Sequence, residues 1–175
     1  MFIHLKHKII KIIENIPLLQ IFIYNNLYNF RFLFPHDKDY YALRLLFKTT
    51  EKRSFADIGG NIGLSSIGFR ELGFLKNKIH IFEPDKFLIK SYLNKVKKFY
   101  NKLIIYPFGL SNKNHSSILY KAFYKDILFH FNNSFSKDYI KNKLFENYGV
   151  KSKKFKLKKT KLNLKKFDDL KINDD

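Results

Sequence analysis

The stretch that decides the fold is Ser54–Phe69, SFADIGGNIGLSSIGF. A short apolar run ends in a turn with glycines at 59, 60 and 63, and a segment of helical spacing follows from Leu64 to Leu72. Glycine adopts positive φ angles and leaves room for close approach, so this turn suits a strand that passes directly into a helix. We therefore expect a strand at 54–58 and a helix at 64–72, with Gly73 as the helix stop.

The alternation of strand and helix continues on both sides of this stretch. A helix is predicted at 36–48, a second strand at 79–82, an amphipathic helix at 86–100 and a third strand at 103–107. Strands that alternate with helices at this spacing are typical of right-handed βαβ crossovers in a parallel sheet. The predicted fold class is therefore α/β.

The chain after Leu110 has a different pattern. The turn cluster Ser111–Asn114 lies between two apolar runs and predicts a hairpin at that point. Short alternation at 117–124 and 154–164 predicts added antiparallel strands, the second with lysines on one face. Residues 132–150 have no clear pattern.

Residues 1–34 form an N-terminal segment that we expect to be helical, and residues 35–175 form the domain that follows. The apolar run Ile16–Tyr24 is too short to cross a bilayer, which needs about 20 apolar residues, and no signal-peptide cleavage site follows it. Isoleucines at 9, 12, 13 and 16 have helical spacing and predict an amphipathic helix that packs on the domain. Weak peripheral membrane contact is the alternative, and a cytoplasmic location is expected.

The composition is that of a globular and strongly basic protein. The formal net charge is +19, but only four of the 34 basic residues are Arg, the residue best suited to bidentate phosphate contacts. Lys, Asn, Ile, Phe and Tyr are all encoded by A/T-rich codons, so an A/T-rich genome explains the composition better than a dedicated nucleic-acid site does. There is no cysteine, which excludes disulfides, thiol nucleophiles and zinc ribbons.

The glycine turn and two acids are the candidate site. Gly59, Gly60 and Gly63 expose backbone at the start of a helix, where amide donors and a partial positive charge favour a carboxylate. Asp57 ends the preceding strand, in a position to balance an ammonium or sulfonium charge. This combination predicts S-adenosylmethionine as cofactor.

Glu83 directly follows the second predicted strand. It comes after Asp57 at roughly the spacing, about 20 residues, at which doubly wound folds keep an acid for ribose hydroxyls. Asn61 is a further candidate cofactor-binding residue, and it stabilises the loop or tolerates a left-handed conformation there. A nicotinamide site fits less well, because the G-x-G-x-x-G order cannot be laid over GGNIG and Asp57 would crowd a pyrophosphate. No general base is assigned, and no metal site is predicted.

The segments FADIGGNIGLSSIGF and IHIFEPD resemble those of the FkbM-type methyltransferases, which have a D-x-G-x-N-x-G loop and a following strand that ends in E-P. GLSNKNHSSILY and LNLKKFDDL are similar to later segments of that family. The resemblance implies a Rossmann-like class I methyltransferase sheet and methyl transfer from S-adenosylmethionine. The acceptor it implies is a hydroxyl of a small molecule, commonly a sugar or glycan.

The resemblance stops before the family's next core strand, which ends in D-x-E-G. We therefore expect an incomplete sheet in which the first strand lacks its inner neighbour. The alternatives are a truncated, non-catalytic remnant of such an enzyme and, from the charge and the aromatic content, an RNA-binding or RNA-modifying protein. The oligomeric state is open.

Overall fold

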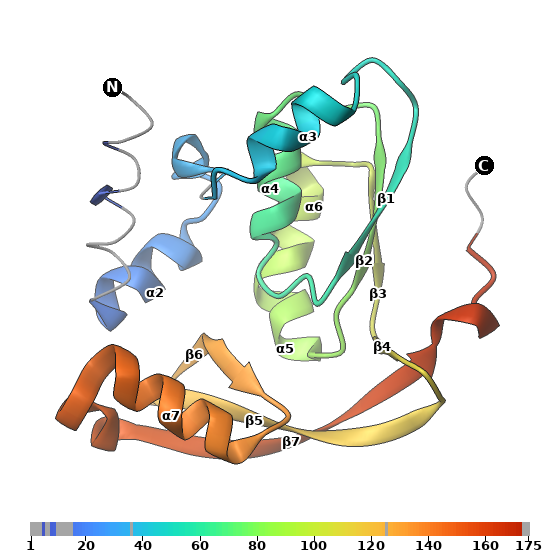
Figure 1. Ribbon diagram of the computed structural model, residues 1–175. Coiled ribbons are helices and arrows are strands. Elements are labelled where there is room, and N and C mark those ends of the chain that lie inside the picture. Colours follow the sequence, from blue (N-terminus) through green and yellow to red (C-terminus); the bar gives the residue numbers. More distant parts are fainter. Residues whose placement is uncertain (1–4, 6–7, 10–15, 36, 125, 173–175) are drawn as a thin grey trace.

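The computed structural model describes residues 5, 8–9, 16–35, 37–124 and 126–172. The fold is mixed α/β, with one parallel sheet of three strands and one mixed sheet of four strands that runs beneath it in Figure 1. The predicted α/β class is thereby confirmed at this level.

The parallel sheet contains β1 (Ser54–Ile58), β2 (Lys78–Phe82) and β3 (Leu103–Tyr106) in the order β1-β2-β3. Between the strands the chain forms α4 (Leu64–Glu71) and then a continuous helical segment of α5 (Lys86–Leu88), a π-helical turn (Ile89–Leu93) and α6 (Asn94–Phe99). These helices lie on one face of the sheet (Figure 1). The predicted order of these strands and helices is confirmed, with bounds that differ by at most one residue.

The two faces of the parallel sheet differ in burial at β1, whereas β2 is buried on both faces, with His80 and Phe82 on the side opposite the helices. On the helix side, Ile79, Ile81 and Leu103 are fully or almost fully buried and pack with Leu93 of the helical segment. On the other side, Ile58 is 66% exposed. Among the described strands, β1 hydrogen-bonds only with β2, so it is an edge strand of this sheet.

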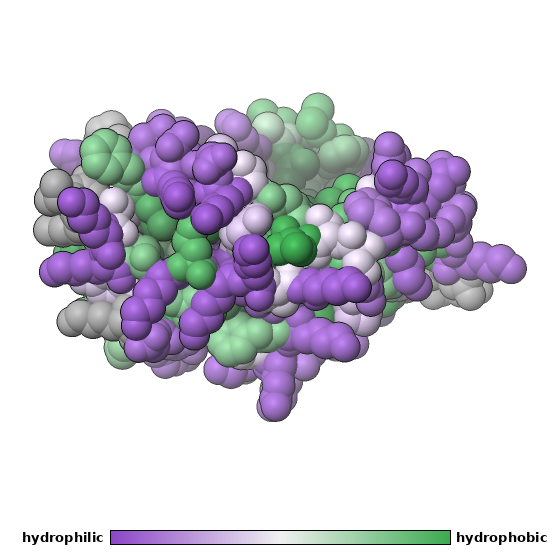
Figure 2. Space-filling view, turned by 90° about the horizontal axis from the view of Figure 1, so that it is seen from below, coloured by the Kyte–Doolittle hydropathy of each residue, from purple (hydrophilic) through white to green (hydrophobic). Residues whose placement is uncertain are grey.

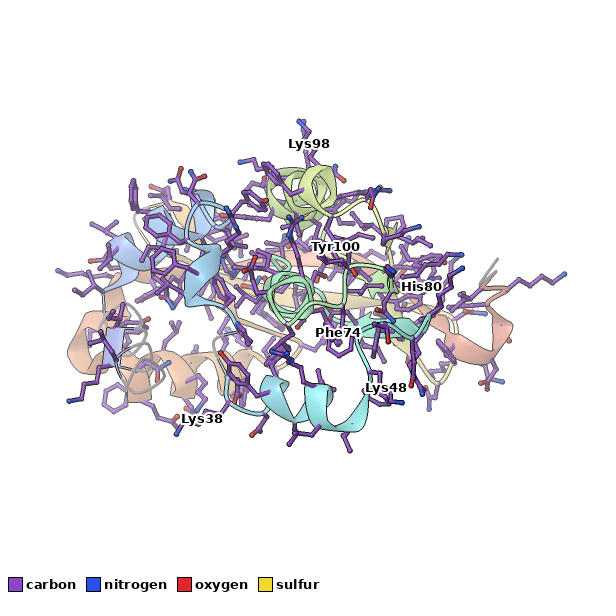
Figure 3. All side chains as sticks on the ribbon, turned by 90° about the horizontal axis from the view of Figure 1, so that it is seen from above. Lys38, Lys48, Phe74, His80, Lys98 and Tyr100 are labelled. Carbon is purple, nitrogen blue, oxygen red and sulfur yellow. The ribbon has the colours of Figure 1, made fainter. Side chains whose placement is uncertain are left out.

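A hydrogen-bonded cluster fixes the helices at the amino end of the sheet. The hydroxyl of Tyr100 donates to the carbonyl oxygens of Phe74 at 2.5 Å and Asn77 at 2.8 Å. Phe74 and Tyr100 lie among the helices, whereas His80 lies toward the other side of the strands (Figure 3). The helix predicted at 36–48 is shorter, since α3 spans only Tyr40–Leu46.

The mixed sheet contains β4 (Gly109–Ser111), β5 (His115–Tyr124), β6 (Ile127–Ser134) and β7 (Phe155–Lys166) in the order β4-β7-β5-β6. The hairpin predicted at Ser111–Asn114 is wrong. Leu164 of β7 is the register partner of both Gly109 and His115, so β4 and β5 flank β7 on opposite sides. The side chain of Asn114 binds the backbone amide of Lys166 at 2.9 Å, which carries the turn around the end of β7.

β5 and β7 pair in antiparallel fashion along the whole of β5, as the alternation predicted. The lysines of β7 do not share one face, because the inward positions change phase from Phe155 and Leu157 to Leu162 and Leu164. Near the start of β7, helix α7 (Lys137–Tyr148) covers the face on which Phe155 and Leu157 lie. Near the end of β7, the parallel sheet covers the opposite face, on which Leu164 lies. In Figure 2, which views the molecule from below, hydrophilic side chains dominate this surface, with apolar groups between them.

The N-terminal segment contributes to both cores. In α2 (Pro17–Asn25), Ile23 and Tyr24 belong to the core on the helix side of the parallel sheet. Ile21 instead packs with α7 and the mixed sheet. The helix predicted around Ile9–Ile16 falls largely outside the described residues. None of the helices described is both long and apolar enough to cross a membrane. The short helical turns are Arg31–Leu33, Gly149–Lys154 and Phe167–Asp169.

Candidate cofactor site

A pocket of about 260 Å³ lies where the carboxyl ends of β1 and β2 meet the mixed sheet. Gly59, Asn61 and Glu83 form its wall on the side of the parallel sheet. Leu119 and His130 belong to the opposite wall. The structure therefore brings part of the predicted site together at one pocket, at the edge where α/β sheets bind ligands.

The glycine loop between β1 and α4 has three residues with left-handed backbone: Gly59 at φ 80°, Asn61 at φ 49° and Gly63 at φ 88°. A side chain on Gly59 would meet nothing within 4 Å, so the backbone there is open. Gly60 is different, because a Cβ on it would lie 2.2 Å from Cγ2 of Ile81. Gly60 thus allows the loop to pack on β2, and only Gly59 and Asn61 of these four residues line the pocket.

Glu83 ties the loop to the end of β2. Its Oε2 accepts the backbone amide of Asn61 at 2.8 Å, and its Oε1 accepts the backbone amide of Asp85 at 2.8 Å. Glu83 is only 5% exposed, and this burial raises the pKa of its carboxyl group. A carboxylate has about four lone-pair sites, so each oxygen retains capacity to accept a further hydroxyl from the pocket.

Asp57 lies behind the loop and does not line the pocket. Its Oδ2 is buried and has no hydrogen-bond partner among the described residues. Burial raises the pKa of Asp57 to about 6, because ionisation without a partner in a desolvated position is costly. An unpaired acid of this kind fits a cationic ligand that would stabilise its charge.

His130 of β6 is a wall residue that the sequence analysis did not single out. Its ring lies between Tyr24 and Tyr92, with centroid distances of 5.4 and 5.5 Å, and its carbonyl oxygen accepts from Nδ2 of Asn61 at 3.5 Å. Burial lowers the pKa of His130 to about 3, so the ring is neutral near pH 7. The sequence around His130 does not indicate that this residue lies at the pocket, because only tertiary packing brings β6 over the glycine loop.

Within the described part of the chain, no three His, Cys, Asp or Glu side chains are grouped closely enough to hold a metal ion. Searches against family models, curated proteins and solved structures found no match to this chain. The chemistry of the site is therefore argued from its own residues.

Proposed function

We propose that this chain is an S-adenosylmethionine-dependent methyltransferase with a Rossmann-like class I sheet, similar to the FkbM-type enzymes. The observation that supports the proposal most is that the glycine loop, the unpaired acid Asp57 and the acid Glu83 converge at the carboxyl ends of two adjacent parallel strands. The resemblance further suggests a sugar or glycan hydroxyl as the acceptor.

In this proposal each residue of the site has a distinct part in cofactor binding. Glu83 accepts hydrogen bonds from the ribose hydroxyls with the lone pairs that the loop leaves free. Gly59 and Asn61 offer backbone along the pocket, while Gly60 and Gly63 hold the loop in shape. When bound, the cofactor supplies an electrophilic methyl group on a sulfonium centre.

Asp57 balances the positive charge of the cofactor in the same proposal. Its carboxylate has one buried oxygen behind the glycine loop and is costly to ionise in the free protein, so the positive charge of a cofactor on the other side of that loop would stabilise the ionised form and contribute to binding. Affinity for the cofactor should accordingly rise with pH up to about 6, the pKa of Asp57, and then level off.

Calorimetry with S-adenosylmethionine tests the proposal on the full chain. We expect a micromolar Kd for the native protein and a loss of about tenfold or more in Asp57→Ala and Glu83→Ala, since a hydrogen bond to a charged group contributes about 1.5 to 3 kcal/mol. The control is Lys161→Ala, whose side chain is exposed on β7 away from the pocket. Absence of binding, or equal binding by all four proteins, contradicts the proposal.

Transfer of a tritiated methyl group from S-adenosylmethionine to a panel of monosaccharides and glycans tests the enzymatic step. Label in a hydroxyl-bearing acceptor, lost in both site variants, supports the methyltransferase. Binding that is retained without transfer to any acceptor would instead favour a non-catalytic remnant.

A further inference from the structure

Lys121 of β5 is a buried cation that joins the mixed sheet to the candidate site. It is only 6% exposed, and its Nζ forms an ion pair with Oδ2 of Asp85, which is 2% exposed. Its register partner on β7, Lys158, is exposed. A lysine is rarely buried unless it is paired, so the position of Lys121 is set by Asp85.

Asp85 passes this contact on to Glu83. The backbone amide of Asp85 donates to Oε1 of Glu83 at 2.8 Å, while Oδ1 of Asp85 caps α5 by accepting the amide of Phe87 at 3.0 Å. The carboxylate of Asp85 is thus held between the start of a helix and the ammonium of Lys121. Both acids at the end of β2 are buried, two residues apart, and one of them lines the pocket.

Two neighbouring buried acids, such as Glu83 and Asp85, oppose each other's ionisation. The negative charge of Asp85 raises the pKa of Glu83, and the positive charge of Lys121 lowers it. Burial is the largest influence on the pKa of Glu83, and among the described residues Asp85 and Lys121 are the charged side chains that act on it. His130, which faces the same pocket from β6, is neutral above a pKa of about 3.

We propose that Lys121 is a positioning residue for the nucleoside-binding acid: by pairing with Asp85 it compensates the charge next to Glu83 and holds the end of β2 so that Glu83 faces the pocket. The assignment of Glu83 to a ribose rests on the proposed function. The electrostatic coupling of Lys121 to Glu83 does not, and it is measurable without any ligand. The mixed sheet then does more than form a wall, since it supplies the counter-charge of the site.

Carbon-13 NMR of the Glu83 carboxyl, followed from pH 3 to 9, tests the coupling in the full chain. Lys121→Met should raise the titration midpoint of Glu83, because an uncompensated Asp85 charge then faces it. The double variant Lys121→Met/Asp85→Asn removes both charges and should bring the midpoint back toward its native value. Lys158→Met, the register-matched control, should leave it unchanged.

Calorimetry with S-adenosylhomocysteine on the same proteins links the coupling to binding. We expect the Lys121→Met variant to bind more weakly than the native protein at pH values near and below the Glu83 midpoint and to approach native affinity at higher pH, with recovery in the double variant. An unchanged Glu83 midpoint in Lys121→Met, or a midpoint that the double variant does not restore, overturns the inference. A shifted midpoint with no ligand binding by the native chain upholds the coupling and contradicts the proposed function instead.

Discussion

The two sheets of this protein differ in how they use charge and backbone. The parallel sheet ends in a loop with left-handed residues and holds the buried acid Glu83 and the partly buried acid Asp57. The mixed sheet exposes most lysines of β7 to solvent, whereas Lys121 of β5 is buried against Asp85 at the end of the parallel sheet. The comparison suggests that unfavourable electrostatics are concentrated where a ligand is proposed to bind, and that the mixed sheet supplies walls and one counter-charge.

The largest expected effect distinguishes the glycines of the two sheets. In Gly60→Ala, the added Cβ would lie 2.2 Å from Ile81, whose side chain is fully buried in the centre of the parallel sheet. We expect the free energy of unfolding to fall by about 3 kcal/mol. In Gly109→Ala the nearest atom, at 2.6 Å, is the end of the Leu164 side chain, which is able to rotate, so the loss should be about 1 kcal/mol.

Urea unfolding followed by circular dichroism measures both variants. Equal losses would mean that the glycine loop is no more tightly packed than the mixed sheet, and would remove the structural contrast between the two regions.

The second prediction concerns the cost of a buried charge. The folded pKa of Asp57, about 6, is above its ordinary value, so the folded state binds a proton more readily than the unfolded state and loses stability as pH rises from about 4 to 6. Asp57→Asn removes this penalty and should raise the free energy of unfolding by about 3 kcal/mol at pH 8, with little change at pH 4.

Asp126→Asn is the control from the mixed sheet. That carboxylate is exposed and lies 3.7 Å from Lys156, and asparagine tolerates its positive φ, so its replacement should change stability little at either pH. Denaturant curves at pH 4 and pH 8 give the comparison. If Asp57→Asn destabilised the protein at pH 8, the argument that Asp57 is held at a cost would be wrong.

The smallest effect is expected on the exposed side of β7. Lys161→Ala removes a solvated cation opposite Ile118, and we expect the midpoint of thermal unfolding to move by less than the equivalent of about 0.5 kcal/mol. A larger loss would show that the lysines of this strand stabilise the fold, which would weaken the contrast between buried and solvated charges.

Local sequence predicted the parallel half well, because its strands, helices and glycine turn are each defined by neighbouring residues. The mixed sheet was harder, since the pairing of Gly109 with Leu164 joins residues far apart in the chain and leaves no local signal. Helix α7 was missed because only Ile140 and Leu144 of its polar sequence are buried. The positions of Asp57 and Glu83 at the ends of two adjacent strands could be predicted from the local pattern and its spacing, whereas the position of Lys121 is apparent only from the contact between the two sheets.

The most direct test of the proposed cofactor site is an amide chemical-shift map recorded while S-adenosylhomocysteine is added to the isotopically labelled full chain at pH 7.5. If the cofactor binds in the pocket at the ends of β1 and β2, we expect shifts at Gly59, Asn61 and Glu83. Weaker shifts are expected at His130 across the pocket, and none at Lys159 or Lys161 on β7. Shifts confined to another surface, such as the pocket that Tyr28, Tyr92 and Phe99 line, or no shifts at saturating ligand, would contradict the proposed site.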